Sequence, residues 1–169
     1  MNRMIIFVLL ALSGCGGYSI RNIDKPAPQA YEGWVKPGAS LLDIKKALLE
    51  CGDPHYAPTV FIYEAIGLKT LDERLRFGFM VEACMEKAGF SQRWGGNLEK
   101  SCRMQPEYKT YPTCQPGAVI PERSVVRRLN SWHCKLKTDR DYCRKHSFTP
   151  AACDDPKRDY NNPPPECRP

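Results

Sequence analysis

The stretch Ser40–Pro54, SLLDIKKALLECGDP, gives the clearest indication of the fold. Its apolar residues recur at helical spacing and form one stripe, while its lysines lie away from that stripe. The leading serine, followed three residues later by Asp43, is typical of a capped helix start. Gly52 can end the helix in a left-handed conformation, and the proline that follows prevents its continuation. The pattern predicts an amphipathic helix over 41–51 that ends in Cys51.

A second amphipathic helix is predicted in Thr70–Phe90, TLDERLRFGFMVEACMEKAGF. Its threonine and Glu73 form another capping pair, and Gly89 stands where a left-handed C-terminal residue is favoured. Neither helix can bury its apolar stripe alone, so we expect the two to pack on each other. A disulfide between Cys51 and Cys84 would close a loop of about 34 residues and stabilise the pair by roughly 3–4 kcal/mol.

The chain holds nine cysteines, an odd number for a disulfide framework. If Cys15 has a separate role, eight remain: Cys51, Cys84, Cys102, Cys114, Cys134, Cys143, Cys153 and Cys167. An even set in an oxidising compartment predicts up to four bridges. Besides the helix pair, proximity favours Cys102 with Cys114. The last four cysteines are expected to pair among themselves, in a connectivity that stays open.

Residues 91–169 differ in character from the helical pair, because they hold six of the eight framework cysteines and few apolar runs. Short helices are predicted near 121–131, with Val125, Val126 and Leu129 inward, and near 139–146. A turn of helix is predicted at Thr149-Pro150, and the tail NNPPPECRP is predicted to be extended. Such a polar stretch cannot offset its ordering entropy by burial alone, so disulfides are the expected substitute. The fold class is therefore mainly α: a small disulfide-stapled domain with a helical pair and a loop-rich C-terminal half.

The N-terminus has the order of a secretory signal: a positive Arg3, an apolar run over 4–12, and small residues before Cys15. The apolar run is too short to span a hydrocarbon core, which needs about 20 residues. Leu12-Ser13-Gly14-Cys15 also resembles the lipobox of bacterial lipoproteins. The alternative is an ordinary secretory signal with a chance cysteine.

The lipobox resemblance implies cleavage before Cys15 and acylation of that cysteine, so that membrane lipid is the first partner. One acyl chain anchors a protein only marginally, but several chains hold it stably. The implied organisation is a signal peptide over 1–14, a lipidated N-terminus and flexible tether over 15–33, and a single disulfide-rich domain over 34–169. That domain divides into the helical pair at 34–90 and the cysteine-rich half at 91–169. Gly16, in place of Asp, implies the outer membrane by the sorting rule of enterobacterial lipoproteins.

Two further resemblances concern the folded part. The chain is similar to small cysteine-rich envelope lipoproteins without an assigned task, through Trp34, Cys51-Gly52 and Cys84-Met85. VKPGASLLDIKKALLECGDP also resembles the start of the small lipoprotein subunit of the outer-membrane barrel-assembly machine. That family continues into antiparallel strands, whereas this chain continues into a second long helix and a cysteine-rich half.

Charge is distributed unevenly along the chain. Residues 91–169 carry 15 lysines and arginines against nine aspartates and glutamates, whereas residues 15–90 carry nine against ten. The basic half could contact envelope proteins or anionic surface groups, or it could simply be a solvated surface. Nucleic acid is not an expected partner outside the cytoplasm. The tryptophans Trp34, Trp94 and Trp132 could be core anchors or part of a binding surface.

The sequence contains no recognisable catalytic, cofactor or metal motif. It has neither a Cys-x-x-Cys redox or haem motif nor a Gly-x-Ser-x-Gly elbow. His133-Cys134 and Cys143 near His146 could suggest zinc, but disulfides would consume these thiols. We therefore expect a membrane-anchored, non-enzymatic interaction module of the cell envelope, with no cofactor and no metal. The alternatives are an accessory subunit of an outer-membrane assembly or envelope complex, and an envelope enzyme.

Overall fold

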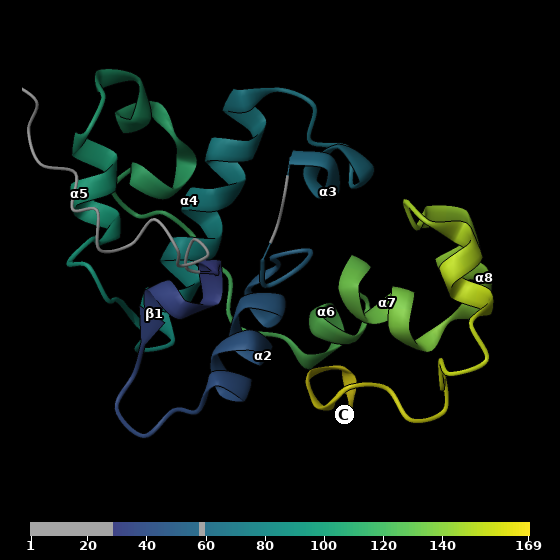
Figure 1. Cartoon of the computed structure of the whole chain (residues 1–169). Coiled ribbons are helices and arrows are strands. Elements are labelled where there is room, and N and C mark those ends of the chain that lie inside the picture. The colour runs from purple at the N-terminus through teal and green to yellow at the C-terminus, as the bar shows by residue number, and fades with distance from the viewer. Residues whose placement is uncertain (1–28, 58–59) are drawn as a thin grey trace, which may run out of the picture.

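The protein is described by a computed structural model that covers residues 29–57 and 60–169. Cys15 and the predicted signal peptide lie outside these residues. The described chain is mainly helical, as the sequence predicted, with a single two-stranded ribbon and 3-10 turns (η) between the helices (Figure 1). In chain order the elements are η2 (Ala30–Gly33), β1 (Trp34–Val35), α2 (Leu41–Cys51), α3 (Val60–Ala65), α4 (Leu71–Lys87), β2 (Ser91–Gln92), α5 (Leu98–Arg103), η3 (Pro106–Thr110), η4 (Pro112–Cys114), α6 (Val125–Leu129), α7 (Trp132–Thr138), α8 (Arg140–His146), η5 (Pro150–Asp154) and η6 (Pro165–Cys167).

The two predicted long helices, α2 and α4, are confirmed together with their capping signals. The Ser40 hydroxyl accepts the Asp43 N–H at 3.2 Å, and the Asp43 carboxylate accepts the Ser40 N–H at 2.8 Å. Thr70 and Glu73 form the same reciprocal pair of hydrogen bonds at the start of α4. Gly52 ends α2 with a φ of 111°, a value that L side chains rarely adopt. These bonds satisfy backbone donors that a helix start leaves without partners.

Helices α2 and α4 pack on each other and form the first core, which also buries Trp34 and Phe90. The Cys51–Cys84 disulfide joins their C-terminal ends inside this core. Strands β1 and β2 pair antiparallel beside it, with Trp34 opposite Gln92. Tyr31 of η2 packs against the same core and Gly33 is buried. Residues 29–33, which the sequence assigned to the tether, are therefore part of the fold.

The orientation predicted for the helix near 121–131 is wrong. Val125 and Val126 of α6 are 48% and 70% exposed, whereas Arg128 is buried at 2%. The reason is an ion pair, since Arg128 packs inward against the buried Glu50 of α2. An apolar stripe cannot reveal a helix that is held by a buried charge.

The C-terminal half contains two α-helices that the sequence did not predict, α5 and α7, and α7 lies directly before α8. Ser131 caps α7 and Asp139 caps α8. The turn at Thr149-Pro150 opens η5 as predicted. The proline-rich tail is not extended throughout, since its residues Pro165–Cys167 form the 3-10 helix η6.

Each of three small cores is built around a disulfide. Cys51–Cys84 lies in the first core; Cys143–Cys153 lies in a second core with Ile62, Trp132 and Leu136; Cys134–Cys167 lies in a third core with Leu49. The fourth disulfide, Cys102–Cys114, ties α5 to η4. Two of these pairs are the ones that the sequence favoured, and the last four cysteines do pair among themselves. Across the described ranges, no helix combines the length and apolar character needed to cross a membrane.

Candidate functional site

A cavity of about 550 Å³ lies where α7, η5, η6 and the segment after α2 meet. Its size falls within the range of small-molecule sites. Its lining combines aromatic rings, cations and one carboxylate: His55, Tyr56, Trp132, His133, Leu136, Lys137, Ser147, Thr149, Ala152, Arg158, Pro164 and Glu166. The lining residues come from five separate stretches of the chain.

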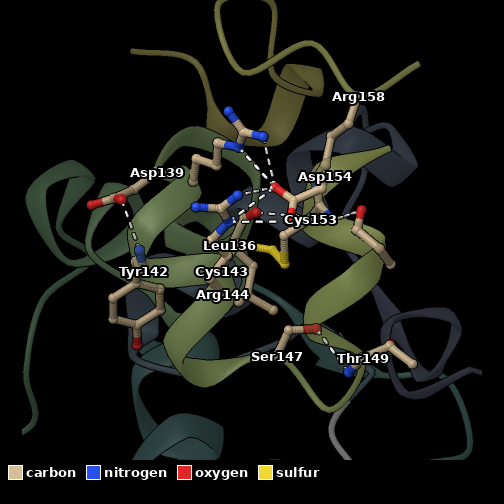
Figure 2. Close-up of a disulfide and its surroundings, with 12 residues drawn as sticks. Leu136, Asp139, Tyr142, Cys143, Arg144, Ser147, Thr149, Cys153, Asp154 and Arg158 are labelled. Carbon is tan, nitrogen blue, oxygen red and sulfur yellow. Dashed lines mark hydrogen bonds and ion pairs between the residues drawn. A yellow bond between two sulfur atoms is a disulfide. The ribbon is translucent and has the colours of Figure 1, made fainter. Parts of the chain in front are cut away.

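Two disulfides and an exposed ion-pair cluster around Asp154 tie these stretches to one another. Cys134–Cys167 ties α7 to η6, and Cys143–Cys153 ties α8 to η5. Figure 2 shows the second of these, with Asp154 and Arg144 beside it. The Asp154 carboxylate accepts from Arg144 and also from Arg140, at 2.7–3.0 Å. This ion pair fixes η5 against α8 and thereby the cavity wall that carries Ala152.

The floor of the cavity is positioned by Arg128. Its Nε donates to Glu50 at 3.0 Å, and its Nη1 donates to the backbone carbonyls of Glu166 and Arg168. Arg123 completes the pairing of Glu50 at 2.7 Å. Because a buried charge is stable only when it is paired and hydrogen-bonded, this arrangement holds α2, α6 and η6 in one geometry.

Aromatic rings form one side of the cavity. The His55 and His133 rings lie 4.6 Å apart, edge to face, and Tyr56 stacks on His55 at 4.7 Å. Trp132 approaches His55 edge-on at 6.3 Å. Edge-to-face and stacked pairs at these separations are favourable and geometrically specific. Most rings of this wall meet at steep angles, so a planar ligand would pack against a single ring face or ring edge.

Both histidines are neutral near pH 7. Burial lowers the pKa of His55. The pKa of His133 is lowered by its burial and, to a smaller extent, by the neighbouring His55. The Ala57 N–H donates to His55 Nδ1 at 3.0 Å, so the neutral His55 ring carries its proton on Nε2. His133 Nε2 lies 3.2 Å from Glu166 Oε1 and must be protonated in order to donate to it.

Lys137 and Arg158 form the cationic side of the cavity. Burial, and next the charge of Arg158, lowers the pKa of Lys137. Arg158 donates hydrogen bonds to two backbone carbonyls, from Nη1 to Ala152 at 3.2 Å and from Nη2 to Leu136 at 2.8 Å. Arg158 and Leu136 are labelled in Figure 2. Among the described residues, neither cation forms an ion pair with a carboxylate, and Glu166 instead accepts a hydrogen bond from the neutral His133 ring.

Two buried donors that belong to lining residues lack a partner in the described part of the chain. They are Nε1–H of Trp132 and Nε–H of Arg158. Trp132 is only 8% exposed, so its indole N–H is withdrawn from bulk water. A buried donor without a hydrogen bond costs roughly 1–3 kcal/mol. Such donors indicate a place where a ligand acceptor would be favourable.

An exposed aromatic pair lies beside the cavity. Phe61 of α3 and Phe148, which follows α8, are 66% and 59% exposed, and their rings lie 6.2 Å apart. Phe148 also packs at 5.8 Å against Trp132, a cavity residue. Large exposed aromatic residues that gather in one place are characteristic of interaction surfaces.

The residues that the sequence singled out are only partly brought together. Trp34 and Trp132 are core anchors, whereas Trp94 is 67% exposed and lies between β2 and α5. His55 and His133 meet in the cavity, but His146 stacks on Tyr142 instead. Sequence reasoning missed Glu166, Lys137 and Arg158, which no motif marks. The described residues hold no group of three or more metal-ligating side chains.

Comparisons of the chain with protein-family models, with curated proteins and with solved structures gave no match.

Proposed function

We propose that this protein is a bacterial envelope lipoprotein, anchored through acylated Cys15, whose folded domain is a non-enzymatic interaction module. The observation that carries the proposal is the sequence Leu12-Ser13-Gly14-Cys15 after an apolar run of signal-peptide length. Four disulfides in the described residues support an oxidising compartment. Gly16 favours the outer membrane.

The contact surface of the module is the face that carries Phe61 and Phe148. This face combines exposed aromatic rings with the two cations, Lys137 and Arg158, that have no carboxylate partner in the described chain. Aromatic residues and arginine are enriched in the centres of protein interfaces. By charge complementarity, the partner is an envelope protein segment with apolar and acidic side chains.

The anchor is tested by a substitution of Cys15. Cys15→Ser removes the acylated thiol and should move the protein from the membrane fraction to the soluble envelope fraction. Ser13→Ala is the matched control, because it keeps a small residue before the cleavage point and should leave the protein at the membrane. Membrane retention of the Cys15→Ser protein would contradict the anchor.

The contact surface is tested in cells by site-specific photo-crosslinking. A crosslinking amino acid at Phe61 or Phe148 should capture one envelope protein in defined stoichiometry. Met104, which is 69% exposed and follows α5 at the opposite end of the molecule from α8, is the matched control position (Figure 1). Equal capture from Met104, or none from either phenylalanine, would contradict this surface. A captured subunit of an outer-membrane assembly complex would favour the accessory-subunit alternative.

A further inference from the structure

We propose that the cavity between α7, η5 and η6 is a binding site for a small oxyanionic ligand, a carboxylate or phosphate group joined to a planar body. The cavity shares Lys137 and Arg158 with the proposed contact surface, but ligand binding requires neither the membrane anchor nor the protein partner. It follows from the charges, the free donors and the shape of the cavity.

The first argument is the charge of the lining. Lys137 and Arg158 both line the cavity, and within the described residues neither has a carboxylate partner within 4.0 Å. The Glu166 carboxylate is already engaged by His133 at 3.2 Å. Since both histidines are neutral, the lining carries the two positive charges of Lys137 and Arg158 and the one negative charge of Glu166, which leaves an excess of one positive charge. Two neighbouring cations in a partly desolvated site favour an anion between them.

The second argument is the set of hydrogen-bond donors. Arg158 has committed its Nη groups to two carbonyls, which holds the guanidinium in place and leaves Nε–H without a partner. Trp132 Nε1–H is equally unpartnered among the described groups. His55 is a donor through Nε2, because its Nδ1 accepts the Ala57 N–H. A ligand with several acceptor lone pairs satisfies such donors best, and carboxylates and phosphates are the common biological examples.

The third argument is the shape and apolar content of the cavity. About 550 Å³ exceeds what an isolated carboxylate or phosphate would fill. The remaining space is bounded by the His55, Tyr56 and Trp132 rings and by Leu136 and Pro164. Aromatic side chains bind a planar ring by stacking or by edge-to-face contact. The ligand is therefore an anion with a ring-sized body, held by its charge at Lys137 and Arg158.

The test uses the natively processed full chain in neutral detergent, with benzoate, benzamide and inorganic phosphate as probes. Benzamide keeps the ring of benzoate but removes its charge. Isothermal titration calorimetry should show that benzoate binds at least about tenfold more tightly than benzamide, because a hydrogen bond to a charged group contributes roughly 1.5–3 kcal/mol. Phosphate binding would assign the phosphate source, and binding of benzoate alone would assign a carboxylate with a ring.

Two variants locate the site. Lys137→Gln should weaken benzoate binding about tenfold, since it removes the charge and leaves a polar side chain that is one atom shorter. Lys145→Gln is the matched control, because Lys145 is an exposed lysine of α8 that does not line the cavity, and it should leave the affinity unchanged. Circular dichroism would verify that both variants are folded.

The proposal is overturned if neither anion binds at millimolar concentration, if benzamide equals benzoate, or if Lys137→Gln and Lys145→Gln have the same effect. None of these results depends on membrane attachment or on crosslinking at Phe61. Failure of the ligand-site proposal can therefore be told apart from failure of the proposed anchor or of the proposed contact surface.

Discussion

At the scale of single residues, buried charges determine much of this structure. Glu50 and Arg128 are both almost fully buried and 3.0 Å apart, and Arg128 also caps two carbonyls of the C-terminal tail. Removing one member of a buried pair leaves an uncompensated charge, which typically costs 3–5 kcal/mol. The pair fixes the place of η6, and with it Glu166 at the floor of the cavity.

Asp53 differs from this ion pair, because within the described residues its carboxylate accepts a single, long hydrogen bond, 3.4 Å from the His55 N–H. Burial raises the pKa of Asp53 to about 7. The folded protein therefore holds this proton more tightly than the unfolded chain, and stability falls as pH rises from about 4 to about 7.

Asp53→Asn should remove this pH-dependent loss. The amide keeps the acceptor for the His55 N–H and cannot ionise, so the variant should match the natural protein near pH 4. At pH 8 it should be more stable by on the order of 2–4 kcal/mol, the worth of a shift of about three pKa units with allowance for relaxation. The lowered pKa of His133 acts in the opposite direction, but it is common to both proteins and cancels in the difference.

Urea unfolding at pH 4, 6 and 8 measures the difference between the two proteins. The expected difference grows steadily with pH through this window. Parallel stability profiles would show that Asp53 ionises in the folded protein as it does in water.

At the scale of elements, the sequence predicts α2 and α4 well because their signals are local. A reciprocal capping pair, a helical period and a terminal glycine all lie within one or two turns of the helix that they specify. The inward face of α6 was mispredicted because it depends on Glu50, which is more than 70 residues away. Helix α7 was missed because its seven residues contain too short a pattern to recognise.

The four disulfides should contribute unequally. Cys51–Cys84 spans 33 residues and lies in the first core, whereas Cys102–Cys114 spans 12 and is only half-buried. In the chain-entropy model the disulfide that closes the longer loop stabilises the folded protein by roughly 1 kcal/mol more than the other. Removing its buried sulfurs also leaves a cavity in the core, which adds to the loss. Replacing Cys51 and Cys84 together by alanine should therefore cost at least about 1 kcal/mol more than replacing the other pair.

Urea unfolding of the two double variants at one pH compares these costs directly. Each variant loses two cysteines and retains three bridges, so each is the control for the other. Equal destabilisation, or a larger loss from the 102–114 pair, would show that the first core does not depend on its disulfide.

At the scale of the whole molecule, three small cores take the place of one large core, and each contains a disulfide. The cysteine count predicted this stapled architecture, but eight cysteines allow 105 pairings. The cavity could not be predicted for the same reason. His55, Lys137, Arg158 and Glu166 converge only when Cys134 pairs with Cys167 and Cys143 pairs with Cys153, and no local pattern specifies either bond.

The account depends centrally on one cysteine carrying lipid while the other eight are paired. Intact mass spectrometry of the protein purified from membranes, without reduction and after thiol alkylation, tests both parts at once. We predict a chain that begins at Cys15, carries the added mass of its acyl chains, and is eight hydrogens lighter than its fully reduced form, with no alkylated thiol. An unacylated N-terminus, or two or more alkylated cysteines, would contradict the account.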